Sequence, residues 1–560
     1  MLILTSTMFA QEFEAGRYRI TFTDKNESPF SIDNPEEFLS QKAIARRTKF
    51  NIAITEQDLP VNPQYVGKIK ETNAILCNTS KWFNSAIFYI DTITKYNEIK
   101  ALSFIKKIEY VAPKPVYKED VQKLSKQDTI KKDFSVLTGE DKQNFKERLS
   151  SIYKAYGLSI DQNMMLGTVS SHITGHQGQG MTIAIIDAGF LHVDSIAVFQ
   201  KMRDDGRLLG TYDVTGMKEC LDIEDPIYTQ GSHGMTVLSL IGGFYPNKLI
   251  GTAPQANFIL LHSEEEVTEH IVEEDNWVAA AEIADSAGAD IISTSLGYSE
   301  FDNARQSHIY SEMDGNSCII TKGADIASSK GMLCVISAGN SGDEDWKYIT
   351  APADADSVIT VGACDRNEKK VKFSSFGPTS DGRTKPDLMA LGLFPTIVTD
   401  NGTIKNASGG TSFACPLISG CCATLWEEFP DSTAQTIKRA LMQTASRAKK
   451  PNNKYGYGIP NVLAARNYLY AEQLYNFLSN DYILPDFNTF FKTIWNNGNG
   501  VSLQSSFVFL IQTNKNGNPS FIVRDHNYES IKLPEISEKG GKVEIMVSTN
   551  KSISVNIKQR

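Results

Sequence analysis

Five short runs of aliphatic and β-branched residues constrain the fold of this chain more than any other feature. They are Thr182–Ile186, Phe258–Leu261, Ile291–Thr294, Leu333–Ile336 and Val358–Val361. None shows the apolar/polar alternation of a strand with one wet face, so each is expected to be a strand buried on both faces. Helix-like stretches separate the runs. This alternation predicts an α/β architecture in which helices cover a mostly parallel sheet.

Length and composition narrow the class of protein. The chain has 560 residues, enough for about three or four domains. With 41% apolar and 22% charged residues it has the composition of a globular protein. The net charge of −10 argues against a nucleic-acid partner, and no apolar run is long enough for a membrane span. The eight cysteines show neither CxxC nor zinc-ligand spacing, and they are too few to predict a disulfide scaffold.

Changes of composition divide the chain into five parts. Residues 1–10 are apolar and end in small residues, which is typical of the end of a truncated secretory signal; the alternative is an apolar first strand. Residues 11–115 mix strand and helix patterns, 116–150 form a charged linker, 151–475 form the α/β domain, and 476–560 form a small β domain.

Individual elements can be predicted at both ends. Arg17–Thr23 alternates as a strand, and Pro35–Arg47 reads as a helix with Asn34 as its N-cap. In the C-terminal region, Phe507–Ile511 and Val543–Ser548 are strand-like and separated by turn-rich sequence. A small α+β unit therefore precedes the central domain, and a β unit follows it.

Four polar segments lie where buried strands end or helices begin. Asp187 follows the first strand, His233 starts a helix, Asn340 follows a later strand, and Ser412 stands in Gly-Gly-Thr-Ser-Phe-Ala-Cys-Pro, residues 409–416. Pro416 is expected in the first helical turn, where its missing N–H is harmless. Ligand and catalytic groups gather at the carboxyl ends of parallel strands, so these side chains are expected to meet.

The residue types match one kind of chemistry. A serine hydroxyl needs a neighbouring histidine as base, and the histidine needs a carboxylate to fix its tautomer. Asn340 and the backbone N–H of Ser412 could hold a developing oxyanion. Taken alone, an Asp-x-Gly, a His-Gly or a Gly-Asn is more often structural. The Ser412 segment and the order Asp187, His233, Asn340, Ser412 are much more specific.

With these segments in view, the chain resembles the subtilisin-like serine proteases, the subtilase family. The resemblance covers about residues 155–470 and extends to Gly178–Gly180, Phe373–Pro378 and Tyr455–Pro460. It implies the subtilisin-like doubly wound, mostly parallel sheet. It also implies that Asp187, His233 and Ser412 form a catalytic triad with Asn340 in the oxyanion hole. Ser295, Leu296 and Gly297 would pair with substrate backbone.

Residues 11–115 resemble the propeptide of secreted bacterial subtilases, including Asp58–Val61 and Lys81–Asn84. Such a segment implies a folding chaperone and intramolecular inhibitor, and slow folding of a parallel sheet gives a physical reason for one. Cleavage is expected within 113–155. The alternative is a fixed accessory domain.

The resemblance therefore implies a secreted serine endopeptidase made as a zymogen, acting on proteins or peptides without a cofactor for its chemistry. The alternatives are a peptide ligase or macrocyclase that uses the same acyl-enzyme, and a non-catalytic surface-binding protein.

Two features of the resemblance concern particular side chains. Structural calcium is possible, with Gln162, Asp194 and Asn247 near positions of family ligands; the favoured interpretation of these three residues is ordinary polar surface. Cys415 departs from the more usual threonine and could confer sensitivity to thiol reagents. The C-terminal region could serve secretion, surface attachment, stability or carbohydrate binding.

Overall fold

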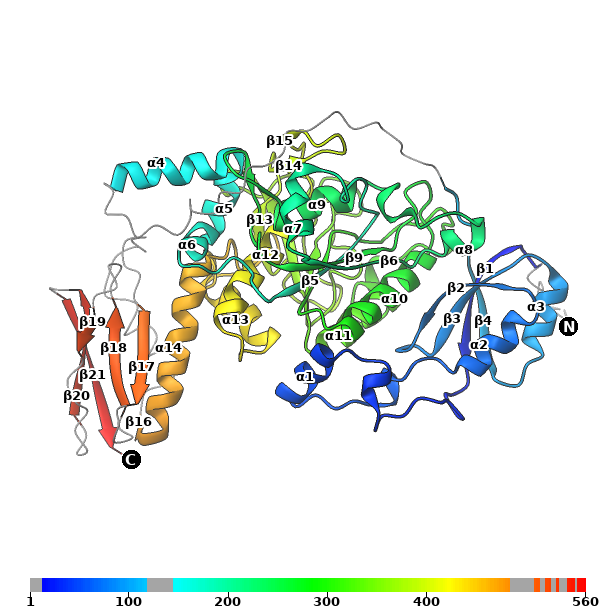
Figure 1. Cartoon of the computed structure of the whole chain (residues 1–560), viewed down its shortest axis with the longest axis horizontal. Coiled ribbons are helices and arrows are strands. Elements are labelled where there is room, and N and C mark those ends of the chain that lie inside the picture. Colours follow the sequence, from blue (N-terminus) through cyan, green and yellow to red (C-terminus); the bar gives the residue numbers. More distant parts are fainter. Residues whose placement is uncertain are drawn as a thin grey trace, which may run out of the picture.

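A computed structural model describes residues 13–117 and 145–483, and five C-terminal strand segments, 508–513, 519–524, 530–532, 541–548 and 551–559. The expected signal remnant and most of the expected linker, with much of the expected cleavage region, lie outside these ranges. Three bodies follow one another along the chain: an N-terminal α+β domain, a large α/β domain and the C-terminal strands (Figure 1). Among the described helices, none has the length and apolar character needed to cross a membrane.

The α/β domain is built on a seven-stranded sheet in the order β13-β12-β11-β10-β5-β9-β6, with every neighbouring pair parallel. The strand order reverses between β5 and β10, which creates a topological switch point beside the carboxyl end of β5. The strands are β5 (Thr182–Asp187), β6 (Leu208–Asp213), β9 (Asn257–His262), β10 (Ile291–Thr294), β11 (Leu333–Ser337), β12 (Ile359–Cys364) and β13 (Leu388–Leu391).

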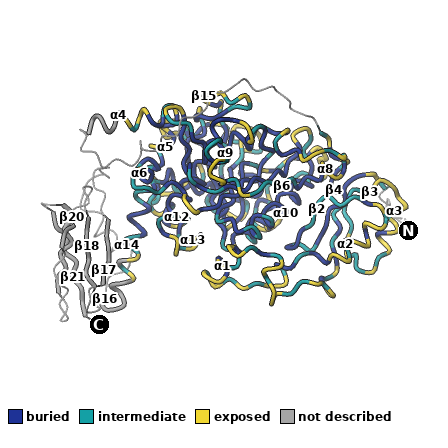
Figure 2. The backbone as a smooth tube through the Cα atoms, viewed as in Figure 1, coloured by how far each residue is buried: buried dark blue, intermediate teal, exposed yellow. Residues whose placement is uncertain are grey.

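Helices cover both faces of this sheet, as the continuous apolar strands require. Ile183 and Ile185 of β5 belong to one core cluster, whereas Ala184 and Ile186 belong to the cluster on the opposite face. Figure 2 shows this central region as the most deeply buried part of the chain. The helices are α4 (Phe145–Tyr156), α5 (Ile160–Leu166), α6 (Thr168–Ile173), α7 (Gln200–Asp204), α8 (Met217–Leu221), α9 (His233–Gly242), α10 (Val272–Ala287), α11 (Ile319–Ser329), α12 (Thr411–Glu428), α13 (Ala434–Thr444) and α14 (Val462–Asp481). Two hairpins complete the domain, β7 (Phe244–Tyr245) with β8 (Leu249–Ile250), and β14 (Thr396–Val398) with β15 (Ile404–Asn406).

The five predicted strands are all present, but the sequence did not predict β6 and β13, the two edges of the sheet. β6 is half exposed along its length and lacks a continuous apolar run. β13 has only four residues.

The N-terminal domain is a four-stranded antiparallel sheet in the order β2-β3-β1-β4 with three helices. Its elements are β1 (Gly16–Phe22), α1 (Gln41–Lys49), α2 (Pro63–Lys70), β2 (Ile75–Ser80), β3 (Ser85–Ile90), α3 (Ile93–Lys100) and β4 (Ile105–Ala112). The predicted start of the helix over residues 35–47 was wrong. Pro35–Glu37 forms a single 3-10 turn, and the side chain of Asn34 makes no capping hydrogen bond. The helix begins after Ser40, whose hydroxyl accepts from the backbone N–H of Ala43.

Buried ion pairs dock this domain onto α10. The guanidinium of Arg19 donates twice to Asp275, with both N···O distances 2.6 Å. Arg46 and Arg47 both reach Asp285, at 2.6 and 2.8 Å. Unpaired buried charge is strongly unfavourable, so the complementarity of these groups specifies one docked arrangement.

A carboxylate on α10 also caps the end of β2. Glu282 accepts hydrogen bonds from the Ser80 hydroxyl and from the backbone N–H groups of Lys81 and Trp82, at 2.6 to 2.9 Å. The N-terminal sheet and the α10 face of the large domain are therefore joined by both charge and backbone contacts.

The C-terminal segments form two three-stranded antiparallel sheets, β16-β21-β20 and β17-β18-β19. Figure 1 shows these strands beside α14, on the side of the large domain opposite the N-terminal sheet. The strands are β16 (Tyr482–Ile483), β17 (Val508–Thr513), β18 (Pro519–Arg524), β19 (Ser530–Lys532), β20 (Gly541–Ser548) and β21 (Lys551–Gln559). Helix α14 runs past the expected boundary at 475/476 before the strands begin.

Candidate active site

Two glycine-rich loops bring Asp187 and His233 together. Asp187 is the last residue of β5 and His233 the first of α9. The intervening loops touch through Gly189 and Gly231, both with positive φ, and a Cβ on Gly231 would lie 1.4 Å from the carbonyl oxygen of Ala188. Only glycine permits this approach. The result is a 2.6 Å hydrogen bond from Nδ1 of His233 to Oδ1 of Asp187.

The environment of this pair favours the charged imidazolium. Asp187 is fully buried, and its Oδ1 also accepts from the backbone N–H of Ala188. Burial lowers the pKa of His233, but the charge and hydrogen bond of Asp187, with added charge from Glu266 and Glu264, outweigh it and raise the pKa above its usual value. The carboxylate thus fixes the ring with Nδ1 as donor and stabilises a proton on Nε2.

Ser412 lies in the first turn of α12, and the ring of Phe413 next to it is 6.2 Å from the ring of His233. Ser412 keeps 8% of its surface exposed. Among the described residues, no hydrogen bond joins Nε2 of His233 to Oγ of Ser412. Such bonds commonly tighten only when substrate binds, so the missing bond does not argue against His233 as the base.

Asn340 is held in one orientation by the residue before Ser412. Its Oδ1 accepts from both the backbone N–H and the hydroxyl of Thr411, at 2.8 and 3.0 Å. With the amide oxygen occupied, the NH₂ group is the end that can donate to another ligand. Thr411 was not predicted as a site residue; its position beside Ser412 was the available signal.

The prediction that Pro416 lies in the first turn of α12 was wrong. The helix begins at Thr411, which puts Pro416 in the second turn, where its missing N–H leaves the carbonyl of Ser412 without its i+4 partner. The hydroxyl of Ser295 donates to this carbonyl at 2.9 Å. The side chain of Ser295 therefore supports the start of α12, whereas the expected substrate contact concerns its backbone.

Leu296 and Gly297, the other two residues expected to pair with substrate, are less buried than Ser295. Leu296 is half buried and Gly297 is exposed, directly after β10. A Cβ on Gly297 would lie 2.2 Å from the hydroxyl of Thr350, so glycine lets the backbone run close beside that residue. The segment therefore offers exposed backbone at Gly297 next to the end of the central strand.

Cys415 is fully buried, and its thiol contacts the carbonyl oxygens of Thr294 and Val335 at 3.3 Å. Burial raises the pKa of this thiol to about 12. The thiolate is the reactive form, so the structure does not support the expected sensitivity to thiol reagents at this position.

Two side-chain clusters have the composition of metal sites. Glu264, Glu269 and Glu273 offer carboxylate oxygens, the ligands that calcium prefers. Among the described residues, both carboxylate oxygens of Glu273 are buried without a hydrogen-bond partner, which fits a cation. Glu274, His308 and Cys318 offer an oxygen, nitrogen and sulfur set that suits zinc.

Gln162, Asp194 and Asn247, which lie near the positions of family calcium ligands, are not grouped in this way. Gln162 exchanges two hydrogen bonds with the backbone of Thr396, so its amide is already occupied. Asp194 and Asn247 are exposed.

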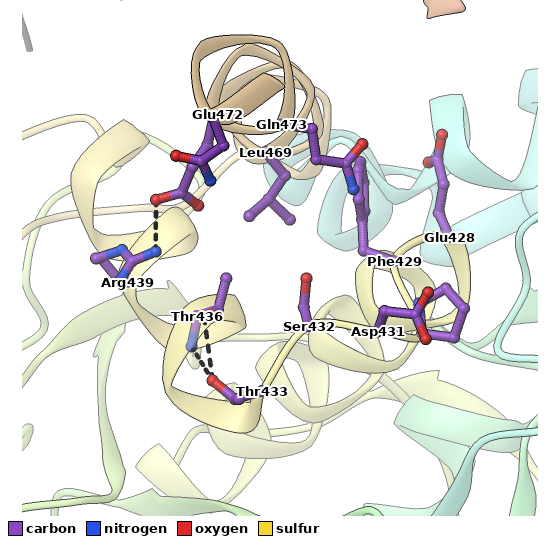
Figure 3. A pocket seen from close by; sticks show the side chains of 12 residues that line it. Glu428, Phe429, Asp431, Ser432, Thr433, Thr436, Arg439, Leu469, Glu472 and Gln473 are labelled. Atoms are coloured by element: carbon purple, nitrogen blue, oxygen red, sulfur yellow. Dashed lines mark hydrogen bonds and ion pairs between the residues drawn. The ribbon is translucent and has the colours of Figure 1, made fainter. Parts of the chain in front are cut away.

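A pocket lies away from Asp187, His233 and Ser412, at the far end of α12 (Figure 3). It has a volume of about 430 Å³ and is lined by mostly polar residues from the end of α12, the loop after it, α13 and α14, together with Phe429, Pro430 and Leu469. An ion pair between Arg439 and Glu472, 2.7 Å long, crosses one side of it. None of its lining residues belongs to the candidate active site.

Comparison with known proteins identifies the class. Residues 178–458, just over half of the chain, match the subtilase family, and residues 17–129 match the peptidase S8 propeptide domain of Bacteroidota. The chain belongs to the subtilase family. It is a serine endopeptidase whose protease domain follows a propeptide domain.

The similar proteins agree with this family. The chain is 29% identical to the serine protease AprX of Bacillus subtilis (strain 168) over 315 residues, which is 51% of this chain and 66% of AprX. It is 28% identical to subtilisin DY of Bacillus licheniformis over 303 residues, covering 52% of this chain and 92% of subtilisin DY. The fold resembles that of the epidermin leader peptide processing serine protease EpiP of Staphylococcus aureus, with a TM-score of 0.52, 18% identity and coverage of 81% of this chain and 98% of EpiP.

Proposed function

We propose that this protein is a secreted protease that is made as a zymogen and hydrolyses peptide bonds through an acyl-enzyme on Ser412. The observation that carries the proposal is the hydrogen bond between Asp187 and His233, 2.6 Å long, at the switch point of the sheet. In this assignment His233 takes the proton of Ser412 and later gives it to the leaving amine. Asp187 orients the ring and stabilises the imidazolium.

Asn340 and the backbone N–H of Ser412 would hold the oxyanion. The anchoring of Oδ1 by Thr411 supports this role because it directs the amide NH₂ away from Thr411. The N-terminus of α12 adds a favourable dipole for negative charge. Both donors are preorganised, and preorganised donors stabilise the tetrahedral intermediate without having to rearrange during the reaction.

Substrate would bind as an added strand along the exposed backbone at Gly297. Backbone pairing tolerates many side chains, which suits an endopeptidase for proteins and peptides. The propeptide domain would act as the intramolecular inhibitor, held on α10 by its arginines and by Glu282 until the chain is cut between 113 and 155. The match of this domain to a propeptide domain of Bacteroidota supports export of the protein from the cytoplasm.

The test is the intact mass over time of the purified wild type and the Ser412→Ala variant, each expressed with an added signal peptide. Loss of the first 113–155 residues in the wild type alone is the expected result. Equal cutting in both proteins would assign the cleavage to a host protease. An uncut wild type that stays inactive after limited proteolysis would contradict the proposal.

Replacing Asn340 by Leu should lower kcat by about 10²–10³-fold with little change in KM, because the lost donor acts on the oxyanion and not on bound substrate. Subtilisin is the reference system for this magnitude. Thr411→Val should have a smaller effect in the same direction, since it removes one of the two hydrogen bonds that orient Asn340. Steady-state kinetics on a peptide substrate measure both. A change confined to KM would contradict the oxyanion role.

The pH profile should report the raised pKa of His233. The active form is the neutral imidazole, so kcat/KM should fall as pH decreases through a midpoint above 6.5. Glu266→Gln removes one of the charges that raise this pKa, so the midpoint should move to lower pH, most clearly at low salt. Glu300→Gln removes another exposed carboxylate and serves as the control. An unchanged midpoint in Glu266→Gln would exclude this electrostatic account.

A further inference from the structure

Two cysteines meet across the boundary between the propeptide domain and the protease domain. Cys77 lies in β2 and Cys220 in α8, 143 positions apart, and their sulfur atoms are 3.4 Å apart. All eight cysteines of the chain are free thiols in the structure. This contact differs from packing within one core because its two members belong to parts of the chain that processing would separate.

The backbone on both sides directs the two thiols at each other. The pairing of β2 with β3 is irregular between Leu76 and Asn78, so Cys77 is the extra residue of a bulge. Bulges change the direction of a side chain. On the other side, Gly216 precedes α8 with φ 75°, and a Cβ there would lie 2.4 Å from the Cβ of Cys77. Glycine thus lets the start of α8 pack directly on Cys77.

A neighbouring residue locks this arrangement. The side-chain amide of Asn78 donates to the carbonyl of Val214 and to the side-chain oxygen of Asn276, both at 2.8 Å. These bonds hold β2 against the protease domain at the residue next to Cys77. The two thiols therefore keep their separation for as long as the propeptide is docked.

We propose that Cys77 and Cys220 form a disulfide that keeps the propeptide attached to the protease after the connecting chain has been cut. A disulfide requires the sulfur atoms to approach to about 2.05 Å, which is a shift of less than an ångström for each side chain. The bond would make release of the inhibitor depend on a reductant as well as on proteolysis. This consequence rests on the proposed zymogen function, whereas the bond itself does not.

The chemistry is a thiol–disulfide exchange with a small disulfide such as oxidised glutathione as the oxidant. Exchange begins at Cys77 because it is the partly exposed member, although the hydrogen bond with Cys220 and burial raise the pKa of its thiol and slow this step. The thiol loses its proton to solvent, and the thiolate attacks the reagent and releases one reduced glutathione. The thiolate of Cys220 then attacks the sulfur of Cys77 and releases the second. In the reduced pair the contact with Cys77 lowers the pKa of Cys220, and the charges of Arg17 and Lys114, which act in the same direction, remain in the second step. Two thiols are oxidised and one disulfide is reduced.

The tether changes how the inhibitor behaves after cleavage. A cut propeptide held only by noncovalent contacts is lost on dilution. A tethered one rebinds intramolecularly, at an effective concentration in the millimolar range that dilution does not alter. The processed protease should therefore stay inhibited under oxidising conditions and become active when the bond is reduced.

The first experiment tests the bond without requiring activity. The full-length Ser412→Ala protein is incubated with oxidised glutathione, and its mass should fall by about 2 Da as two thiols are lost. Peptide mapping without reductant should identify a fragment in which Cys77 is linked to Cys220. Two free thiols or stable glutathione adducts at these positions, in protein with an unchanged Tm, would overturn the proposal.

The second experiment follows the processed wild type. On a non-reducing gel the propeptide should migrate with the protease, and a reductant should separate them and raise activity in diluted enzyme at least tenfold. Cys77→Ser and Cys220→Ser should lose the propeptide without reductant. Cys334→Ser, which removes a buried thiol of β11 that contacts α11 within the protease domain, should behave as wild type. Linked Ser412→Ala protein with an unprocessed wild type would contradict the proposed function and leave the tether standing. Normal processing of the wild type without a link between Cys77 and Cys220 would contradict the tether and support the proposed function.

Discussion

Replacing Ser412 by Ala is expected to lower kcat for a protein substrate by about 10⁶-fold, to a rate that only binding and the oxyanion donors sustain. The magnitude is that of subtilisin, the reference system for such replacements. In the proposed mechanism the Asp187–His233 pair activates a single hydroxyl at the start of α12, and alanine would leave the base without a nucleophile to activate. The measurement is the rate of casein hydrolysis by enzyme from which the propeptide has been removed.

Ser408→Ala is the matched control, because Ser408 is an exposed serine in the same loop, four residues before Ser412. It should retain wild-type activity. A Ser412→Ala protein that folds, as judged by its Tm, and hydrolyses casein within tenfold of the wild type would exclude an acyl-enzyme on this residue.

Replacing Asp187 by Asn should lower kcat by about 10⁴-fold with little change in KM. The side chain is fully buried and receives the Nδ1–H of His233, so its shape can be kept while its charge is removed. An asparagine can present its NH₂ group to Nδ1 and so hold the ring in the tautomer whose Nε2 carries the proton. That tautomer cannot accept the proton of Ser412.

Asp194→Asn controls for the loss of one negative charge, since Asp194 is an exposed acid in the loop that follows the same strand. Its kcat should stay close to the wild type. If Asp187→Asn raised KM and left kcat unchanged, Asp187 would have to be assigned to substrate binding.

The core of the fold could be predicted because its signal is local. Strands buried on both faces need continuous apolar runs, and the five runs form five consecutive parallel strands of the sheet, β12-β11-β10-β5-β9. The candidate active-site segments were readable for a related reason, since each combines a distinctive residue type with the end of such a strand or the start of a helix. The edge strands β6 and β13 carry no comparable run and were missed.

The contacts that the sequence did not predict depend on a distant partner. Because Pro416 has no N–H for the carbonyl of Ser412, that carbonyl accepts a hydrogen bond from the hydroxyl of Ser295, 117 positions earlier. The occupied amide of Gln162 depends on Thr396, and the meeting of Cys77 with Cys220 depends on how two domains dock. Spacing within a sequence does not contain such contacts.

The most direct test of the central assignment is covalent labelling of processed enzyme with a fluorophosphonate, which reacts with a serine only when a base activates it. The account predicts one adduct on the peptide that contains Ser412, and none in Ser412→Ala or in His233→Ala. Labelling of His233→Ala at the wild-type rate, or an adduct on a different serine, would contradict the assignment of Asp187, His233 and Ser412 as the triad.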